Sequence, residues 1–175
     1  MHPDVSSVLI SEEALRTRVK ALAAKISEDY RDKNPLLVCI LKGAVIFFSD
    51  LFRAMSTDCT CDFLGASSYG GGTCTSGSVE LYKDVTEQID GRHVIVVEDI
   101  YDTGVTLDFV KKHLLAKHPA SLSVCVLLDK PARRMPGIDV APEYVGFTID
   151  PYFVVGYGLD CDQKYRHLPY IGVMK

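Results

Sequence analysis

The segment Val94–Leu107, VIVVEDIYDTGVTL, constrains the fold of this chain more than any other stretch. Four apolar residues run into two adjacent carboxylates, a third carboxylate follows, and Thr-Gly-x-Thr then leads into a helical pattern. This order of residue types is typical of a buried strand that ends in a short polar loop and opens a helix. Units of this kind predict an α/β protein.

The loop after this strand combines two kinds of chemical group. Backbone N–H groups and the positive end of the dipole at a helix start bind anions. Glu98, Asp99 and Asp102 repel anions instead. Donors beside acidic groups suit a ligand that carries a phosphate, sugar hydroxyls and a magnesium ion. The segment therefore predicts a ribose-phosphate site.

Length and charge restrict the class of protein. The 175 residues suffice for one domain with a substantial core. A net charge of −4 argues against a surface that coats nucleic acid, and no apolar run approaches the roughly 20 residues of a membrane helix. The N-terminal residues lack a signal-peptide pattern, so we expect a cytoplasmic protein. Its six cysteines are interpreted as reduced structural thiols rather than a metal or redox centre.

Apolar periodicity predicts the order of elements along the chain. Helical spacing follows Ser11, which is a candidate N-cap, and recurs at 44–55 and around Leu107, Val110 and Leu114. Buried strands alternating with these helices predict a mostly parallel sheet with helices on both faces. The strands are expected at 36–41, 59–66, 79–82, 93–97, 122–128, 144–149, 153–155 and 170–173.

Three polar clusters follow strand ends in this scheme: Lys42-Gly43, Glu98–Thr106 and Asp129-Lys130. Ligands of such folds bind outside the carboxyl ends of the strands, so the clusters are expected to converge. Residues 67–78 are rich in Gly, Ser and Thr. They are either a hairpin tip with no task or a lid that excludes water, and a phosphosugar site nearby favours the lid.

The chain resembles the type I phosphoribosyltransferases. Residues 96–108, VVEDIYDTGVTLD, match the phosphoribosyl pyrophosphate-binding signature of that family, with two acidic residues, two variable positions and Asp-Thr-Gly-x-Thr. Other segments are similar to one branch, the short bacterial hypoxanthine-guanine phosphoribosyltransferases. They are LKGA at 41–44, SSYG at 67–70, LLDKPARR at 127–134 and FVVGYGLDCDQKYRHLPYIGVMK at 153–175.

The resemblance implies a single domain over 1–175 with the type I phosphoribosyltransferase fold. That fold is a mostly parallel twisted sheet flanked by helices, with a small hood over the purine site from the N-terminal residues and about 150–175. The implied reaction transfers a 5-phosphoribosyl group from phosphoribosyl pyrophosphate to N9 of hypoxanthine or guanine. It gives IMP or GMP and pyrophosphate, uses Mg²⁺, and serves purine salvage. The resemblance implies a homodimer or homotetramer that acts on small molecules.

The resemblance also implies roles for individual residues. Asp102 matches the general acid/base near purine N7, and Lys130 matches the donor to the exocyclic O6. Phe153 would stack on the purine, while the main chain of Val154 and the region of Asp160 would read its edge. The implied magnesium ligands are Glu98, Asp99 and Asp160. The residues implied in binding phosphoribosyl pyrophosphate are Lys42, Gly43, Ser68, Tyr69, Glu98, Asp99, Asp102, Thr103, Gly104, Val105, Thr106 and Arg166.

Some alternatives stay open at this point. Asp102 also fits a helix N-cap, and Phe153 also fits a core aromatic on a short strand. The peptide bond of Lys42-Gly43 is often cis in the family, which the sequence does not establish. Tyr101 stands where an aliphatic residue is common. The remaining functional alternatives are a xanthine-preferring enzyme and a non-catalytic regulator that senses phosphoribosyl pyrophosphate and binds nucleic acid.

Overall fold

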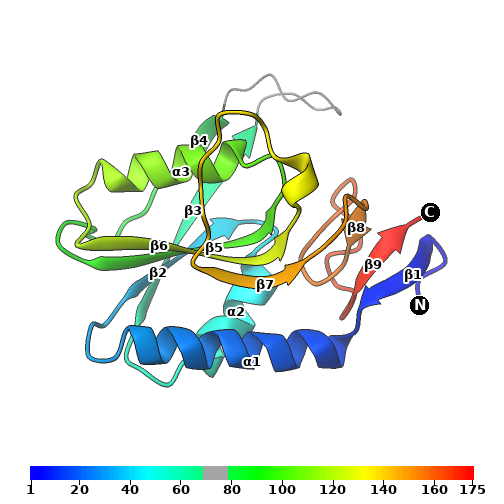
Figure 1. Ribbon diagram of the computed structural model, residues 1–175, viewed down its shortest axis with the longest axis horizontal. Coiled ribbons are helices and arrows are strands. Elements are labelled where there is room, and N and C mark those ends of the chain that lie inside the picture. Colours follow the sequence, from blue (N-terminus) through cyan, green and yellow to red (C-terminus); the bar gives the residue numbers. More distant parts are fainter. Residues whose placement is uncertain (69–78) are drawn as a thin grey trace.

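The computed structural model describes residues 1–68 and 79–175, which form two sheets and three α-helices within that part of the chain (Figure 1). The larger sheet has the strand order β4-β3-β2-β5-β6-β7, in which β4 alone is antiparallel to its neighbour. Its strands are β2 (Leu36–Leu41), β3 (Thr60–Ser68), β4 (Val79–Lys83), β5 (His93–Tyr101), β6 (Ser121–Asp129) and β7 (Tyr144–Thr148).

Helices cover both faces of the larger sheet, as the sequence predicts. α1 (Glu12–Asp29) and α2 (Val45–Ala54) lie on one face, and α3 (Val105–Leu115) lies on the other (Figure 1). Alternate residues of the central strands supply the two cores. Leu37, Cys39, Ile95 and Cys125 pack with α1 and α2, whereas Leu36, Val38, Val94 and Val124 pack with α3. Burial on both faces explains why these strands read as continuous apolar runs.

α1 begins where the sequence places its cap. The Ser11 Oγ accepts a hydrogen bond from the Ala14 N–H at 3.2 Å, and Glu12 and Glu13 lie in the first turn beside the positive end of the helix. The cysteines at positions 39 and 125 are fully buried, and burial raises the pKa of both thiols. Both are inert structural thiols, as predicted.

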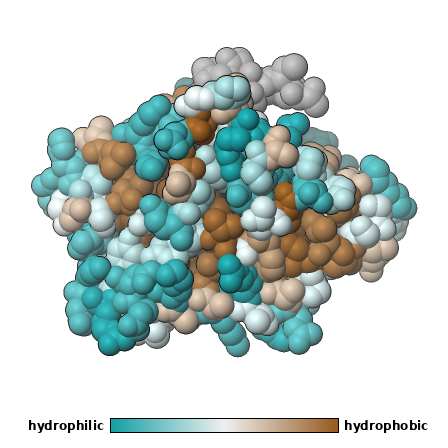
Figure 2. Space-filling model, viewed as in Figure 1, coloured by the Kyte–Doolittle hydropathy of each residue, from teal (hydrophilic) through white to brown (hydrophobic). Residues whose placement is uncertain are grey.

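A smaller sheet joins the two ends of the described chain. Its order is β1-β9-β8, where β1 is Val5–Ile10, β8 is Val154–Val155 and β9 is Ile171–Met174. β9 is antiparallel to both neighbours, and the Lys175 N–H donates to the Asp4 carbonyl at 3.1 Å. Figure 2 shows apolar side chains gathered on this face of the molecule, between β7 and the smaller sheet.

The structure corrects several expected boundaries. β1 was not expected at all, because only Val5 and Ile10 at its two ends are buried and its pairing with β9 is irregular, so no alternation marks it. β5 continues to Tyr101 because its last residues pair with β6, so Glu98 and Asp99 belong to the strand. β3 likewise continues to Ser68, inside the expected lid. The rest of that expectation, with Tyr69, lies outside the described residues.

No helix in the described part of the chain is both long enough and apolar enough to cross a membrane.

Asp62 on β3 is a buried carboxylate that holds a neighbouring loop. It accepts hydrogen bonds from the backbone N–H groups of Phe63, Thr86 and Glu87 at 2.6–2.8 Å. Burial raises the pKa of Asp62, but these bonds and Lys83 outweigh it and lower the pKa overall. Asp62→Ala leaves the three donors without this acceptor.

We expect Asp62→Ala to lower the free energy of unfolding by about 3 kcal/mol. Urea denaturation measures this change. Asp62→Asn, which keeps one acceptor oxygen, should cost less. An Ala variant as stable as the wild type would contradict the expectation.

Asp84 links the segment after β4 to α3. Its carboxylate contacts Lys117 Nζ and His113 Nε2, each at 2.9 Å. Burial acts to raise the pKa of Asp84, but these bonds and the Val85 N–H lower it to about 2. The pKa in the folded state is thus below the value of about 3.9 in unfolded chains, so the contribution to stability is present above that value and is lost as pH falls toward 2.

Asp84→Asn should therefore lower stability at neutral pH and lose its difference from the wild type near pH 2, in thermal melts recorded across this range. A difference that stays constant down to the lowest pH would show that the charge of Asp84 contributes nothing.

Candidate active site

A cavity of about 400 Å³ lies at the carboxyl ends of β2 and β5. It gathers most of the residues that the sequence implicates in binding phosphoribosyl pyrophosphate, and Asp160 as well. Ser68 lies at the end of β3, Tyr69 lies outside the described residues, and Val105 is the first residue of α3. The expected site residues that line this cavity are Lys42, Gly43, Glu98, Asp99, Asp102, Thr103, Gly104, Thr106, Asp160 and Arg166.

The loop between β5 and α3 presents unpaired backbone donors. α3 begins at Val105, and its N-cap is Gly104, which has φ of 88° and lends no side-chain cap. Within the described chain, no backbone acceptor pairs with the N–H groups of residues 103–106. These donors and the helix dipole make an anion site. The alternative of Asp102 as an N-cap is wrong, because the chain turns into the helix two residues later.

The acidic pair at the end of β5 is almost completely buried. Glu98 is 8% exposed and Asp99 is 9% exposed, and the Asp99 N–H donates to Glu98 Oε1 at 3.1 Å. Burial raises the pKa of Glu98 well above its usual range, and the charge of Asp99 adds to this effect. Burial also raises the pKa of Asp99, against the opposing effect of Arg166. Sugar hydroxyls or a cation placed here would compensate this buried charge.

The Lys42-Gly43 loop after β2 is pressed against the acidic pair. A Cβ atom at Gly43 would overlap Asp99 Oδ2, and one at Gly158 would overlap the Gly43 carbonyl oxygen. Only glycine therefore fits at position 43. The cis peptide bond of this region joins Leu41 to Lys42, one residue before the bond considered from the sequence.

Asp102 lies between two cationic side chains. Arg133 Nε donates to Asp102 Oδ1 at 3.2 Å, and Lys130 Nζ is 3.9 Å from Asp102 Oδ2. Lys130 is only 6% exposed, and burial lowers its pKa although Asp102 opposes the shift. The polar groups at the ends of β5 and β6 thus converge through Asp102 and Lys130. The Asp129 carboxylate pairs with Arg134 instead. Sequence reasoning missed Arg133, because no spacing relates it to Asp102.

Asp160 and Arg166 form an ion pair at the cavity wall, with 2.9 Å between Asp160 Oδ1 and the Arg166 guanidinium. Arg166 also donates to the Gly158 carbonyl at 2.7 Å, and the Gln163 N–H donates to Asp160 Oδ2 at 2.8 Å. In the described ranges, no three or more His, Cys, Asp or Glu side chains are gathered in a group that could hold a metal ion.

Phe153 lies immediately before β8 and is 58% exposed, so the interpretation as a core aromatic is wrong. Val154 is buried in β8, where its partner in β9 is Val173. The exposed ring next to a fixed strand is free to stack on a ligand. Cys161 packs beside Val5 and Leu168.

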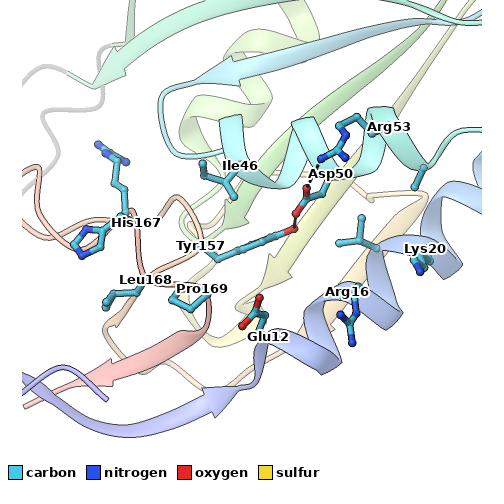
Figure 3. Close-up of a pocket in the computed structure, with 13 residues that line it drawn as sticks. Glu12, Arg16, Lys20, Ile46, Asp50, Arg53, Tyr157, His167, Leu168 and Pro169 are labelled. Atoms are coloured by element: carbon cyan, nitrogen blue, oxygen red, sulfur yellow. Dashed lines mark hydrogen bonds and ion pairs between the residues drawn. The ribbon is translucent and has the colours of Figure 1, made fainter.

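A second cavity, of about 560 Å³, lies between α1, α2 and the segment before β9 (Figure 3). Its wall carries Tyr157, whose hydroxyl donates to Asp50 Oδ2 at 2.6 Å, and its rim carries Arg16 and Lys20. It lacks the acidic pair and the loop before α3, and shares only Arg166 with the first cavity. The smaller cavity is therefore the candidate active site.

Comparison with known proteins agrees with this geometry. The family model of the phosphoribosyl transferase domain matches residues 8–162. A hypoxanthine-guanine phosphoribosyltransferase of Streptococcus thermophilus is 44% identical over 175 residues, which cover 100% of this chain and 96% of the relative.

Two solved structures share the fold. A Staphylococcus aureus hypoxanthine phosphoribosyltransferase has a TM-score of 0.94 and 43% identity, over 100% of this chain and 94% of that chain. A Trypanosoma cruzi hypoxanthine phosphoribosyl transferase, studied for the role of its C-terminal region in oligomeric state and activity, has a TM-score of 0.92 and 37% identity over 100% and 94%. The expected fold is confirmed, and the chain belongs to the phosphoribosyltransferase family.

Proposed function

We propose that this enzyme transfers the 5-phosphoribosyl group of phosphoribosyl pyrophosphate to N9 of hypoxanthine or guanine, releasing pyrophosphate and forming IMP or GMP. The observation that carries the proposal is the convergence at one sheet edge of the buried acidic pair, the unpaired N–H groups before α3 and the Asp102–Lys130 pair. These groups match the three parts of the reaction, namely the ribose, its phosphate and a 6-oxopurine. The relatives named above support the same substrates.

The phosphoribosyl donor is held by groups from several segments of the chain. The N–H groups and hydroxyls of residues 102–106 bind the 5-phosphate. Glu98 and Asp99 hold the ribose hydroxyls, and the Lys42-Gly43 loop with Arg166 binds the pyrophosphate, for which a guanidinium gives bidentate contacts. Ser68, the last residue of β3, and Tyr69 are also proposed to contact the donor.

The purine lies on the other side of the ribose, beneath the smaller sheet. Lys130 donates to O6, which leaves the 6-amino group of adenine poorly paired. Phe153 stacks on the ring, and the main chain near Val154 and Asp160 reads its edge. Asp102 accepts the proton of N7 as the bond to N9 forms, and returns it in the reverse reaction. It thus acts as the general acid/base.

We propose that Mg²⁺ takes part. Carboxylate oxygens suit this ion, which is commonly held by one or two carboxylates together with substrate oxygens. Glu98 and Asp99 meet that requirement, because they are adjacent and buried at the cavity. Asp160 is the second proposed position. When bound, the ion neutralises charge on the leaving pyrophosphate.

A steady-state comparison of hypoxanthine, guanine, xanthine and adenine tests the proposal. Pyrophosphate release should require phosphoribosyl pyrophosphate, should occur with hypoxanthine or guanine, and should stop when a chelator removes Mg²⁺. Turnover of adenine without turnover of either 6-oxopurine would contradict the role of Lys130. Turnover that survives chelation would contradict the role of the ion.

We infer that the enzyme is a cytoplasmic homodimer or homotetramer. The described cysteines are all free thiols, which suits a reducing compartment. Val45 and Ile46 on α2 are exposed, and Ile46 lines the larger cavity (Figure 3). Neighbouring exposed apolar side chains favour contact between subunits. Sedimentation equilibrium should give a dimer or tetramer, and a monomer at micromolar concentration would contradict this inference.

A further inference from the structure

The segment after β6 binds the carbonyl groups of the loop before α3. The Arg134 guanidinium donates to the Tyr101 carbonyl at 2.9 Å and to the Asp102 carbonyl at 2.7 Å. The Met135 N–H donates to the Thr103 carbonyl at 3.0 Å. Three consecutive carbonyl groups of this loop are therefore turned toward one segment.

This arrangement fixes the direction of the N–H groups. In a trans peptide the C=O and N–H bonds point to opposite sides. The N–H groups of Asp102 and Thr103 share peptide planes with the two carbonyls that Arg134 binds, and the Gly104 N–H shares one with the carbonyl that Met135 binds, so all three point away from that segment. All three residues line the candidate active site. The bonds to the carbonyls thus aim the loop donors at the cavity.

Arg134 is itself held on several sides. Its guanidinium lies 3.0 Å from the centre of the Tyr101 ring and forms an ion pair with Asp129. Tyr101 is 2% exposed, and its hydroxyl donates to the Val140 carbonyl at 2.7 Å. A cation stacked on a buried, anchored ring has little freedom to move.

The loop also packs directly on this stack. A Cβ atom at Gly104 would lie 2.7 Å from Tyr101 Cε2 and 3.4 Å from Arg134 Cδ. Gly104, the N-cap of α3, therefore rests on both partners. The stacking of Arg134 on the ring accounts for an aromatic residue at position 101, because an aliphatic side chain would offer no flat face to the guanidinium.

We propose that Arg134, stacked on Tyr101, is a positioning residue that holds the backbone N–H groups of Asp102 and Thr103 toward the 5-phosphate. Arg134 does not line the candidate active site, and it acts through the loop. The inference rests on the proposed function, since it concerns the same phosphate. It distinguishes Arg134 from its neighbour Arg133, which contacts the Asp102 side chain.

The test separates loop positioning from general stability. Arg134→Lys keeps the positive charge but loses the planar guanidinium that donates to two carbonyls. Arg134→Gln loses both the charge and the guanidinium. Each should raise KM for phosphoribosyl pyrophosphate by about 10- to 100-fold, the effect of a displaced binding group, and leave KM for hypoxanthine within about twofold. Arg18→Gln is the matched control, because Arg18 donates to the carbonyls of Val145 and Gly146, each at 2.7 Å, away from the cavity.

Variants of the ring give a second measurement. Tyr101→Phe keeps the stacking face and should change KM for phosphoribosyl pyrophosphate less than Tyr101→Leu. Calorimetric titration with ribose 5-phosphate measures the affinity of the loop for the phosphate without any turnover. Arg134→Gln should weaken that binding by a similar factor. Equal shifts in both KM values, or shifts no larger than those of Arg18→Gln, would overturn the inference. A wild type that binds ribose 5-phosphate but turns over no purine would overturn the proposed function instead.

Discussion

Asp102→Asn should lower kcat by about 10²- to 10⁴-fold, the usual contribution of a positioned general acid/base. KM for both substrates should change little, because the amide keeps the size and one acceptor oxygen of the carboxylate. In the structure this group lies between Arg133 Nε and the Lys130 ammonium, at the end of the loop that forms the anion site. Initial rates with hypoxanthine, measured at saturating phosphoribosyl pyrophosphate, give kcat directly.

Asp108→Asn provides the control for Asp102→Asn. Asp108 lies on α3 six residues further along and pairs with Lys112 at 2.7 Å, outside the cavity. This variant should retain the wild-type kcat. If Asp102→Asn also retained it, the carboxylate would serve only to pair Arg133 and Lys130, and the N7 proton would leave by another route.

Gly43→Ala should produce the second large effect, a fall in kcat/KM of about 10²-fold with a loss of stability of about 1–3 kcal/mol. The added methyl group would overlap Asp99 Oδ2 and lie 2.8 Å from Asp99 Cγ. Either the Lys42-Gly43 loop or the carboxylate must then move, and both are proposed to hold the phosphoribosyl donor. Kinetics and urea denaturation of the same preparation measure the two effects.

A double-mutant cycle identifies the cause of the Gly43→Ala effect. In an Asp99→Ala background the overlapping atoms are gone, so Gly43→Ala should cost much less stability there. Equal stability costs of Gly43→Ala in both backgrounds would rule out the clash with Asp99.

The sequence predicts those parts of the fold whose signals are local. α1 is marked by its cap and apolar spacing, and β2 by a continuous apolar run, so both are predicted nearly to the residue. β1 has no such signal, because its pairing with β9 joins Val5 to Met174 across almost the whole described chain. The sequence predicts the ends of β3 and β5 too early, because continued pairing with a neighbouring strand, as between Tyr101 and Asp129, is not visible in one segment.

The same division applies to the candidate site. The acidic pair and the loop before α3 form one contiguous motif, and the structure places both at one cavity. Contacts between motifs were not predictable. The fit of Gly43 against Asp99 and the bonds from Arg134 to the loop carbonyls depend on how separate strand ends meet. A pattern of residue types therefore indicates which groups take part, whereas the orientation of those groups comes from long-range packing.

The smaller sheet has a consequence for the order of assembly on the ribosome. Five strands of the larger sheet, β2 to β6, can pair as soon as Asp129 has emerged. β1 must wait for β9, because its only strand partner in the described chain is Ile171–Met174. Contacts between residues so distant in sequence form slowly. The nascent chain therefore completes the acidic pair and the loop before α3 first and gains the smaller sheet last.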